Sequence, residues 1–310
     1  MRTLSFIFCL LFIAFSCQPS SQKKETNRER SVKKDSSIFE LKSEIKYNVD
    51  SSDIRIYEKL ISFAKLNQLA TKSFSEIEIE IAHQLLGTPY VSKTLEKDSV
   101  EDLVINLREL DCTTFMENVL AISLCIKNDL TGFESYCSTL KQLRYRDGKI
   151  DQYPSRLHYT TDWLLDNQKK GIIKMASEEF GTSDFDANVN FMSGHPENYK
   201  QLSNPEFVEA IRQHEIRISS SKLKLVPKEK INEVAKSIKD GDMIAISSTT
   251  TGLDFSHVAI ASWHNKHLHF IHASSKEKKV VLSDNTLHDY LAGMKNNDGI
   301  IVARLIETIK

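Results

Sequence analysis

The hydrophobic pattern of this chain changes from helical spacing to short strand-like runs near residue 240. Helices are expected at 53–70 and 73–87 and after Cys112, and the segment 158–235 is mostly helical or irregular. The apolar runs of the C-terminal third, each ended by turn residues, lie at 242–247, 257–263, 267–273, 278–283 and 299–305. Helices that precede the strands, instead of alternating with them, predict an α+β fold with an antiparallel sheet.

The first 50 residues read as a targeting segment followed by a tether. Arg2 precedes the apolar run "LSFIFCLLFIAFSC", which is short for a membrane anchor and resembles a lipoprotein signal ending before Cys17. An ordinary secretion signal with a chance cysteine is the alternative. We expect a signal peptide at 1–16, a lipid on Cys17 and a disordered linker across 17–50. The mature chain would then be held on a membrane in the periplasm.

The net charge of the chain argues against one class of function, and its cysteine count indicates a free thiol. The net charge of −1 leaves no basic surplus for a nucleic-acid surface. Outside the N-terminal segment the chain has three cysteines, Cys112, Cys125 and Cys137. An odd number in an oxidising compartment leaves at least one free thiol. Core packing is expected for Cys125, and Cys137 would either pack in the core or pair with Cys125.

Cys112 stands where a helix is predicted to begin. Asp111 is a natural N-cap, and the apolar residues that follow form one helical stripe. The N-terminal end of a helix favours a thiolate, so a lowered pKa is expected for Cys112. The residue could still be a buried small side chain, half of a disulfide, a metal ligand or a nucleophile.

Two histidines on neighbouring predicted strands favour the nucleophile. A hairpin that turns at His264 and Asn265 would place His257 directly opposite His272. His257 could then act as a base for the cysteine, with His272 orienting its ring. The alternative is a pair of satisfied polar residues in a sheet. A zinc site is disfavoured because no CxxC or HExxH spacing occurs, and no metal or cofactor is predicted.

Several short motifs resemble NlpC-type cell-wall cysteine peptidases, a papain-like superfamily. These motifs are "LGTPY" (86–90), "DCTTF" (111–115), "GDMIAI" (241–246), "SHVAIA" (256–261) and "FIHAS" (270–274). The resemblance implies that Cys112 is the nucleophile, His257 the base and His272 the orienting residue, with Tyr90 lining the cleft. It also implies a papain-like core in which the helix bearing the cysteine packs on the antiparallel sheet.

Further phrases resemble one branch, the N-acetylmuramoyl-L-alanine amidase-like proteins. They are "RLHYTTDWLLDN", "NFMSGHPENY" and "GLDFSHVAIA", and the resemblance covers about 70–305. The chain departs from the simple superfamily core by lacking GG after Pro89-Tyr90 and by its long segment 158–235. The resemblance implies a catalytic amidase domain at 51–310, in which this helical insertion selects the sugar. The implied reaction splits N-acetylmuramic acid from L-alanine in peptidoglycan fragments.

An enzyme that hydrolyses such a substrate needs a hydrogen-bond donor to the oxyanion and polar side chains that bind the substrate. The backbone N–H of Cys112 is a candidate donor. Trp163 could stack on a sugar, although a Trp beside two leucines is more often a core residue. The candidate anchors are Arg108, Arg156, Asn190, Ser193, His195 and Tyr199.

We therefore expect a monomeric, lipid-anchored cysteine amidase that acts on muropeptides. Two alternatives remain open at this point. The same chemistry could cleave the γ-D-glutamyl–diamino acid bond, or the chain could be a catalytically silent wall-binding lipoprotein. The presence of Cys112, His257 and His272 together argues against the silent form.

Overall fold

The computed structural model describes residues 49–96 and 100–307. The predicted signal peptide, the predicted lipid site at Cys17 and nearly all of the predicted linker therefore lie outside the described residues. Among the described residues, no helix has the length and apolar character needed to cross a membrane.

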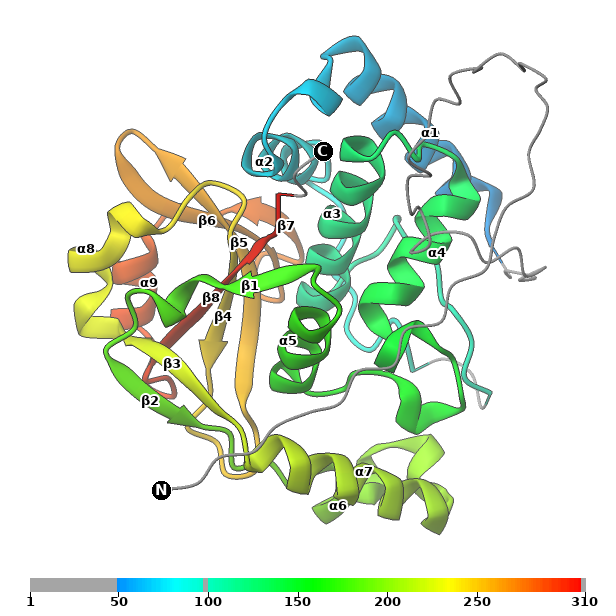
Figure 1. The fold of residues 1–310 in the computed structure, drawn as a ribbon, viewed down its shortest axis with the longest axis vertical. Helices are drawn as coiled ribbons and strands as arrows, with labels where there is room; N and C mark the ends of the chain where they lie inside the picture. Colours follow the sequence, from blue (N-terminus) through cyan, green and yellow to red (C-terminus); the bar gives the residue numbers. More distant parts are fainter. Residues whose placement is uncertain (1–48, 97–99, 308–310) are drawn as a thin grey trace, which may run out of the picture. The chain divides into compact units, whose positions relative to one another are not determined.

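One sheet of eight strands organises the domain, and all of its strand pairs are antiparallel (Figure 1). Along the main path the order is β2-β3-β8-β4-β5-β6-β7, and β1 pairs with β8 off this path. The strands are β1 Ile173–Met175, β2 Ser183–Asp186, β3 Lys222–Pro227, β4 Met243–Ser247, β5 Phe255–His264, β6 His267–Ser274, β7 Lys279–Leu282 and β8 Gly299–Leu305. The five predicted strands and the antiparallel α+β class are confirmed.

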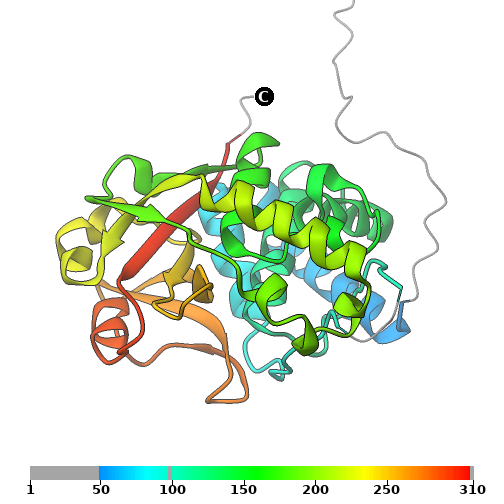
Figure 2. The same cartoon turned by 90° about the horizontal axis from the view of Figure 1, so that it is seen from below.

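Helices cover both faces of this sheet. They are α1 Ser51–Leu66, α2 Phe74–Gln84, α3 Cys112–Lys127, α4 Phe133–Arg144, α5 Thr160–Lys169, α6 Phe191–Gly194, α7 Pro205–Ser219, α8 Ile231–Val234 and α9 Leu287–Ala292. Helices α2 to α5 lie on one side of the sheet and α8 and α9 on the other (Figure 1). Helices α6 and α7 form a separate layer beyond one end of the strands. The view from below shows α7 along its length in this layer (Figure 2).

Alternate side chains of β5 pack against the two helical layers. Val258 and Ile260 join the apolar cluster with α2 and α3, whereas Ala259 and Ala261 join the cluster with α8 and α9. A strand covered on both faces removes apolar surface from water on both sides, and this burial stabilises the centre of the sheet.

Helix α3 is held by its own first turn and by its surroundings. Asp111 accepts a hydrogen bond from the Thr114 backbone, and the Thr114 hydroxyl interacts with the Asp111 backbone N–H, which completes a capping box. The helix packs against α2, α4, β5 and β6. This confirms the predicted helix start and fixes Cys112 as its first residue.

The predicted register of the hairpin between β5 and β6 is wrong by two residues. His264 pairs with His267, and the turn is made by Asn265 and Lys266. Both have positive φ, at 48° and 66°, as a type I′ turn requires, and Asn tolerates that conformation better than His. A two-residue shift keeps every side chain on its face, so His257 and His272 still share one.

The segment 158–235 is mostly helical or irregular, as the sequence predicted, but it also contains three strands that the sequence did not reveal. It contains α5, α6, α7 and α8, and it supplies β1, β2 and β3. These short strands extend the sheet beyond β8. The insertion is therefore part of the sheet as well as of the helical layers.

Candidate active site

A cavity of about 320 Å³ opens where the start of α3 meets the start of β5. Other segments line it as well, among them the loop around Lys93 to Glu96, the stretch from Arg156 to Thr160, Arg144 at the end of α4, and residues of the α6 region such as Met192 and Tyr199. The cavity brings Cys112 and His257 together from positions 145 residues apart in sequence.

Cys112 is half-buried and makes contacts through its sulfur with two elements. The backbone N–H of Val258 and the backbone and hydroxyl of Thr113 act as its hydrogen-bond partners. Val258 follows His257 directly along β5, so the thiol lies against the same stretch of strand that carries the imidazole.

The predicted lowering of the Cys112 pKa is wrong. Burial raises the pKa of this thiol to about 11, and the negative charge of Asp111 adds to the rise. The hydrogen bonds from Val258 and Thr113 favour the thiolate but do not offset the loss of water. At neutral pH the free protein therefore holds a protonated thiol.

His257 and His272 form a direct hydrogen bond of 2.7 Å between Nε2 of His257 and Nδ1 of His272. Burial lowers the pKa of His257 to about 3 and that of His272 to about 4. Both rings are thus neutral at neutral pH. When Nε2 of His257 donates in this bond, its Nδ1 is left free to accept a proton.

Two tyrosines surround this group. Burial raises the pKa of Tyr90, and the adjacent Cys112 raises it further. The ring of Tyr290, on α9, lies 5.9 Å from that of His272, and burial, followed by the nearby Cys112, raises the pKa of Tyr290. Tyr90 therefore lies near the thiol, and Tyr290 is a neighbour that sequence reasoning missed.

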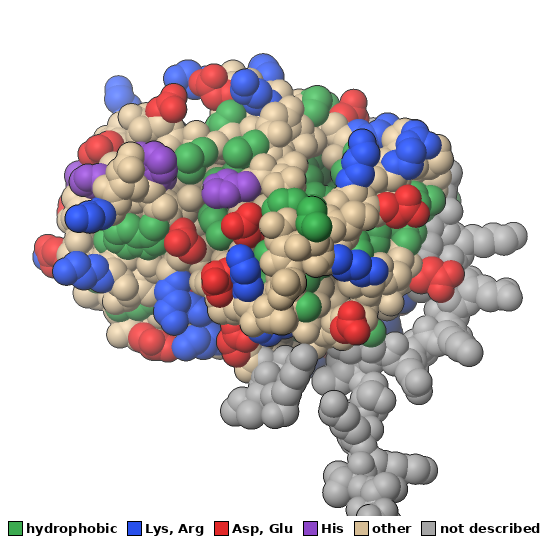
Figure 3. Space-filling model, turned by 90° about the horizontal axis from the view of Figure 1, so that it is seen from above, with side chains coloured by type: hydrophobic (Ala, Val, Ile, Leu, Met, Phe, Trp, Pro, Cys, Tyr) green, Lys and Arg blue, Asp and Glu red, His purple; other side chains and the backbone are tan. Residues whose placement is uncertain are grey.

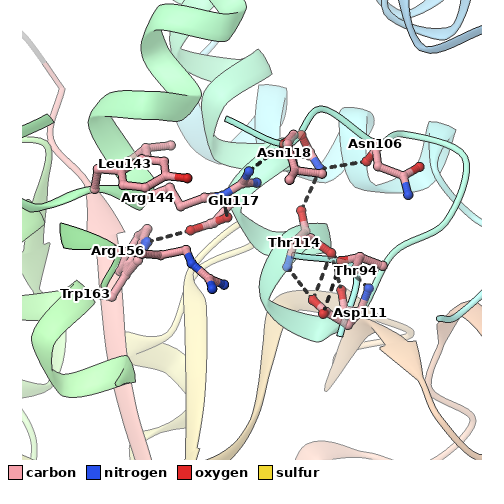
Figure 4. Close-up of polar contacts among 12 residues, drawn as sticks. Thr94, Asn106, Asp111, Thr114, Glu117, Asn118, Leu143, Arg144, Arg156 and Trp163 are labelled. Atoms are coloured by element: carbon pink, nitrogen blue, oxygen red, sulfur yellow. Dashed lines mark hydrogen bonds and ion pairs between the residues drawn. The ribbon is translucent and has the colours of Figure 1, made fainter. Parts of the chain in front are cut away.

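Two Arg–Glu pairs line the cavity, and Figure 4 shows the one between Arg144 and Glu117 beside α3. Nε of Arg144 lies 2.7 Å from Glu117, whose other oxygen accepts from the indole of Trp163. Arg156 contacts Glu96 at 2.6 Å and Glu101 at 3.0 Å. These charges are thus compensated within the protein. Trp163 is buried in the core, the role that is more common for a Trp beside two leucines.

The structure separates the six predicted anchors. Arg156 and Tyr199 line the cavity with Cys112, while Arg108 instead contacts Asp53 at 3.1 Å on α1. Asn190 lines a different groove, beside Gly252. The backbone of Ser193 donates to Glu215, and the exposed ring of His195 stacks on Phe191. Neither of these last two lines the cavity.

The other cysteines do not pair in this structure. Cys125 and Cys137 are fully buried free thiols, which agrees with core packing. Within residues 49–96 and 100–307, no group of three or more His, Cys, Asp or Glu side chains is arranged to hold a metal ion.

Sequence reasoning also missed His158, Glu96, Glu117, Arg144 and Asp254, all of which line the cavity. The one available signal was Glu117, a lone acidic residue in an otherwise apolar stretch of the helix after Cys112. The others reach the cavity through contacts between distant segments, which local spacing does not encode.

The antiparallel sheet and its covering helices define an α+β protein, and this fold matches amidase-like structures. A family model described as AmiA-like, N-acetylmuramoyl-L-alanine amidase-like, matches residues 80–300. The chain belongs to this N-acetylmuramoyl-L-alanine amidase-like family.

Solved structures agree with this assignment. An N-acetylmuramoyl-L-alanine amidase from Bacteroides uniformis ATCC 8492 is 38% identical with a TM-score of 0.73, over 76% of this chain and 99% of that chain. A Bacteroides fragilis protein described as a candidate xylanase is 40% identical with a TM-score of 0.69, over 72% and 98%. Protein LPG0564 from Legionella pneumophila, at 22% identity and a TM-score of 0.62 over 83% and 95%, shares the fold. No curated protein matches the chain.

Proposed function

We propose that this protein is a cysteine amidase that hydrolyses the bond between N-acetylmuramic acid and L-alanine in peptidoglycan fragments. The carrying observation is that a thiol at a helix N-terminus lines one cavity with His257, which is itself hydrogen-bonded to His272. The family assignment and the amidase from Bacteroides uniformis support the choice of bond. The mechanism below uses only residues of this chain and needs no cofactor.

Attack begins with a proton transfer. Nδ1 of His257 takes the proton of the Cys112 thiol as the sulfur adds to the lactyl carbonyl carbon. Because the thiol pKa is about 11 and the imidazole pKa about 3, proton transfer accompanies attack instead of preceding it. The backbone N–H of Cys112, in the first turn of α3, stabilises the developing oxyanion.

Collapse of the tetrahedral intermediate breaks the carbon–nitrogen bond. The imidazolium of His257 gives its proton to the departing nitrogen of L-alanine and leaves a thioester on Cys112. A water molecule then loses a proton to His257 and adds to the thioester, which releases the sugar acid and restores the thiol. His272 accepts from Nε2 of His257 throughout and keeps Nδ1 facing the reaction.

This arrangement is the one that a papain-like NlpC core would provide, and we extend that superfamily relationship to this chain as part of the proposal. The cysteine-bearing helix packed on β5 and β6 supports it. So does the order of nucleophile, base and orienting residue along the chain.

A glycosidase reaction, which the xylanase description of one neighbour would suggest, is less well supported. Glycosidases require a pair of carboxyl groups placed across the scissile bond. The cavity carboxyls are engaged elsewhere: Glu96 and Glu117 with arginines, Asp111 with the α3 cap, and Asp254 with the backbone of Thr161 and Phe255.

Product identity tests the proposal. Disaccharide-peptides are incubated with the protein and with its Cys112→Ala variant, and products are identified by mass. Release of free sugar acid and an intact stem peptide by the unsubstituted protein alone is the expected result. Release of sugar–L-Ala–D-Glu would instead establish γ-D-glutamyl endopeptidase activity. Binding without turnover by either protein would establish a silent module.

We also propose that the mature protein acts in the periplasm as a monomer tethered through a lipid on Cys17. The motif ending at Cys17 supports this. Labelling of the expressed protein by radioactive palmitate, lost in Cys17→Ser, is the expected result. Equal labelling of the Cys17→Ser variant, or none of either protein, would contradict it.

A further inference from the structure

Four polar side chains that line the cavity, Glu96, Arg156, His158 and Tyr199, are here called the Arg156 wall. Figure 4 shows Arg156 on one side of the site and Asp111 and Thr114, at the start of α3, on the other. The wall joins segments far apart in sequence, because the Arg156–Glu96 ion pair links the two loops. A muropeptide offers two kinds of group to such a surface, the hydroxyl groups of its sugar and the carboxylates of its peptide.

The charges of the cavity do not favour an anion. Its lining holds three basic and four acidic side chains: Lys93, Arg144 and Arg156, with Glu96, Asp111, Glu117 and Asp254. Both arginines are buried and already contact carboxylates, Arg156 two of them. Lys93 is exposed, so solvent screens it. A substrate carboxylate entering here would lose its hydration without meeting an uncompensated cation.

His158 adds a neutral acceptor to this wall. Its Nε2 lies 2.9 Å from the carbonyl oxygen of Tyr153, and a carbonyl only accepts, so Nε2 carries the hydrogen. Nδ1 is therefore the acceptor nitrogen of the ring. The ring is packed 4.3 Å from that of Tyr153, which fixes its orientation. Burial and the charge of Arg156 hold the pKa of His158 well below its usual value, so it stays neutral.

Apolar side chains complete the surface. Leu95, Leu157, Met192 and Leu253 line the same cavity as the Arg156 wall. The planar polar side chains of the Arg156 wall donate and accept hydrogen bonds, and apolar side chains lie beside them. This combination matches a sugar ring, which has hydroxyl groups on its edge and C–H groups on its faces. They match an extended acidic peptide poorly.

We propose that the Arg156 wall is the sugar subsite of this enzyme, that His158 accepts a hydrogen bond from the sugar, and that the wall does not bind a stem-peptide carboxylate. This inference rests on the proposed function for the identity of the sugar. It assigns a binding role to His158, a residue that sequence reasoning missed.

Two probes that differ in the relevant groups test this in the Cys112→Ala protein, which binds without turnover. N-acetylmuramoyl-L-alanine amide carries the sugar and no carboxylate. N-acetyl-L-Ala-D-Glu carries carboxylates and no sugar. By calorimetry we expect the sugar probe to bind the more tightly and to keep its Kd within about twofold up to about 0.5 M salt, because no net charge is paired. Tighter binding of the dipeptide, weakened by salt, would overturn the inference.

Substitution of His158 gives the residue-level test. In the Cys112→Ala background, His158→Phe keeps an aromatic ring beside Tyr153 but removes the acceptor nitrogen, so it should weaken the sugar probe about tenfold, the effect of one lost hydrogen bond, and leave the dipeptide unchanged. His195→Phe, at an exposed histidine outside the cavity, is the matched control and should change neither Kd. An unchanged Kd for the sugar probe in folded His158→Phe would overturn the role of His158. If that variant does not fold, the salt series on the protein with His158 intact decides.

Failure of the inference and failure of the proposed function give different results. If Cys112→Ala binds the sugar probe through His158 but the protein with Cys112 intact never cleaves it, the wall stands and the proposed reaction falls. If the sugar probe is cleaved with an unchanged KM in His158→Phe, the reaction stands and the assignment of His158 falls.

Discussion

Cys112 is protonated at neutral pH because burial and the charge of Asp111 raise its pKa to about 11. The thiolate fraction should then rise about tenfold per pH unit from pH 7 toward pH 10. We predict that alkylation of Cys112 by iodoacetamide accelerates across this range without a plateau. The buried Cys125 and Cys137 should not react in the folded protein, so Cys112→Ser is the control for background. A rate already constant from about pH 6 would contradict this and indicate a thiolate–imidazolium pair at rest.

His272 is proposed to act by accepting from His257. His272→Gln keeps a side-chain carbonyl that can accept from Nε2 of His257, whereas His272→Ala removes the acceptor. We predict a loss in kcat of about 100-fold for His272→Ala and a much smaller loss for His272→Gln, with little change in KM for either. Equal losses in both variants, measured by steady-state kinetics, would show that a hydrogen-bond acceptor at this position is not what the reaction needs.

Helix α3 shows how an element sets the protonation state of Cys112, the proposed nucleophile. Asp111 caps the helix and also places a negative charge beside the thiol. Asp111→Asn keeps a good N-cap and removes the charge, so the Cys112 pKa should fall and alkylation at pH 8 should speed up. Asp111→Ala removes the cap as well and should cost about 1 kcal/mol of unfolding free energy.

Chemical denaturation and alkylation rates of the two Asp111 variants separate these roles. Unfolding free energy that is lower by the same amount in Asp111→Asn and Asp111→Ala would contradict the capping role. An alkylation rate at pH 8 that is unchanged in Asp111→Asn would contradict the charge effect.

At the level of elements, sequence reasoning succeeds where the signal is local. The capped starts of α2 and α3 and the apolar runs of β4 to β8 follow from residues near one another in the chain. Strands β1, β2 and β3 escaped because they are short, carry charged residues such as Lys174 and Asp184, and are defined by their partners. The hairpin register was wrong because Asn265, not His264, is the residue that takes the first positive φ of the turn.

The same division applies to the candidate site. The relation of Cys112, His257 and His272 could be inferred from a helix start and a hairpin. Arg108 could not be placed, because its partner Asp53 lies 55 residues away on another helix. His158 and Glu96 likewise reach the cavity through contacts with distant loops. Long-range ion pairs decide which arginines remain near a substrate, and spacing along the chain does not reveal them.

For the whole molecule, buried neutral histidines couple stability to pH. Burial lowers the pKa of His272 to about 4, while unfolded chains bind this proton near pH 6.5. Between these values the unfolded state binds more protons, so stability falls as the pH is lowered. His257, His158 and His214 act in the same direction.

We therefore predict that lowering the pH from 7 to 5 destabilises the protein, and less so after His272→Gln. The contribution is at most about 1.4 kcal/mol per pH unit for each histidine. Denaturant unfolding at the two pH values gives the difference. An equal loss of stability in the unsubstituted protein and in His272→Gln would show that His272 is not neutral in the folded state.

Charge also varies over the molecular surface, where lysines, arginines and acids intermingle on the face seen in Figure 3. The net charge of −1 fits that mixture. Binding of a substrate is therefore expected to depend on the cavity itself and not on long-range attraction.

The most direct test of the account is the mass of the covalent intermediate. The protein is mixed with a disaccharide-tripeptide, quenched in acid within a turnover, and its intact mass is measured. We predict an adduct equal to the sugar acyl group, located on Cys112 and absent in Cys112→Ala. An adduct that also contains L-Ala and D-Glu, or sugar release that persists in Cys112→Ala, would contradict the proposed amidase mechanism.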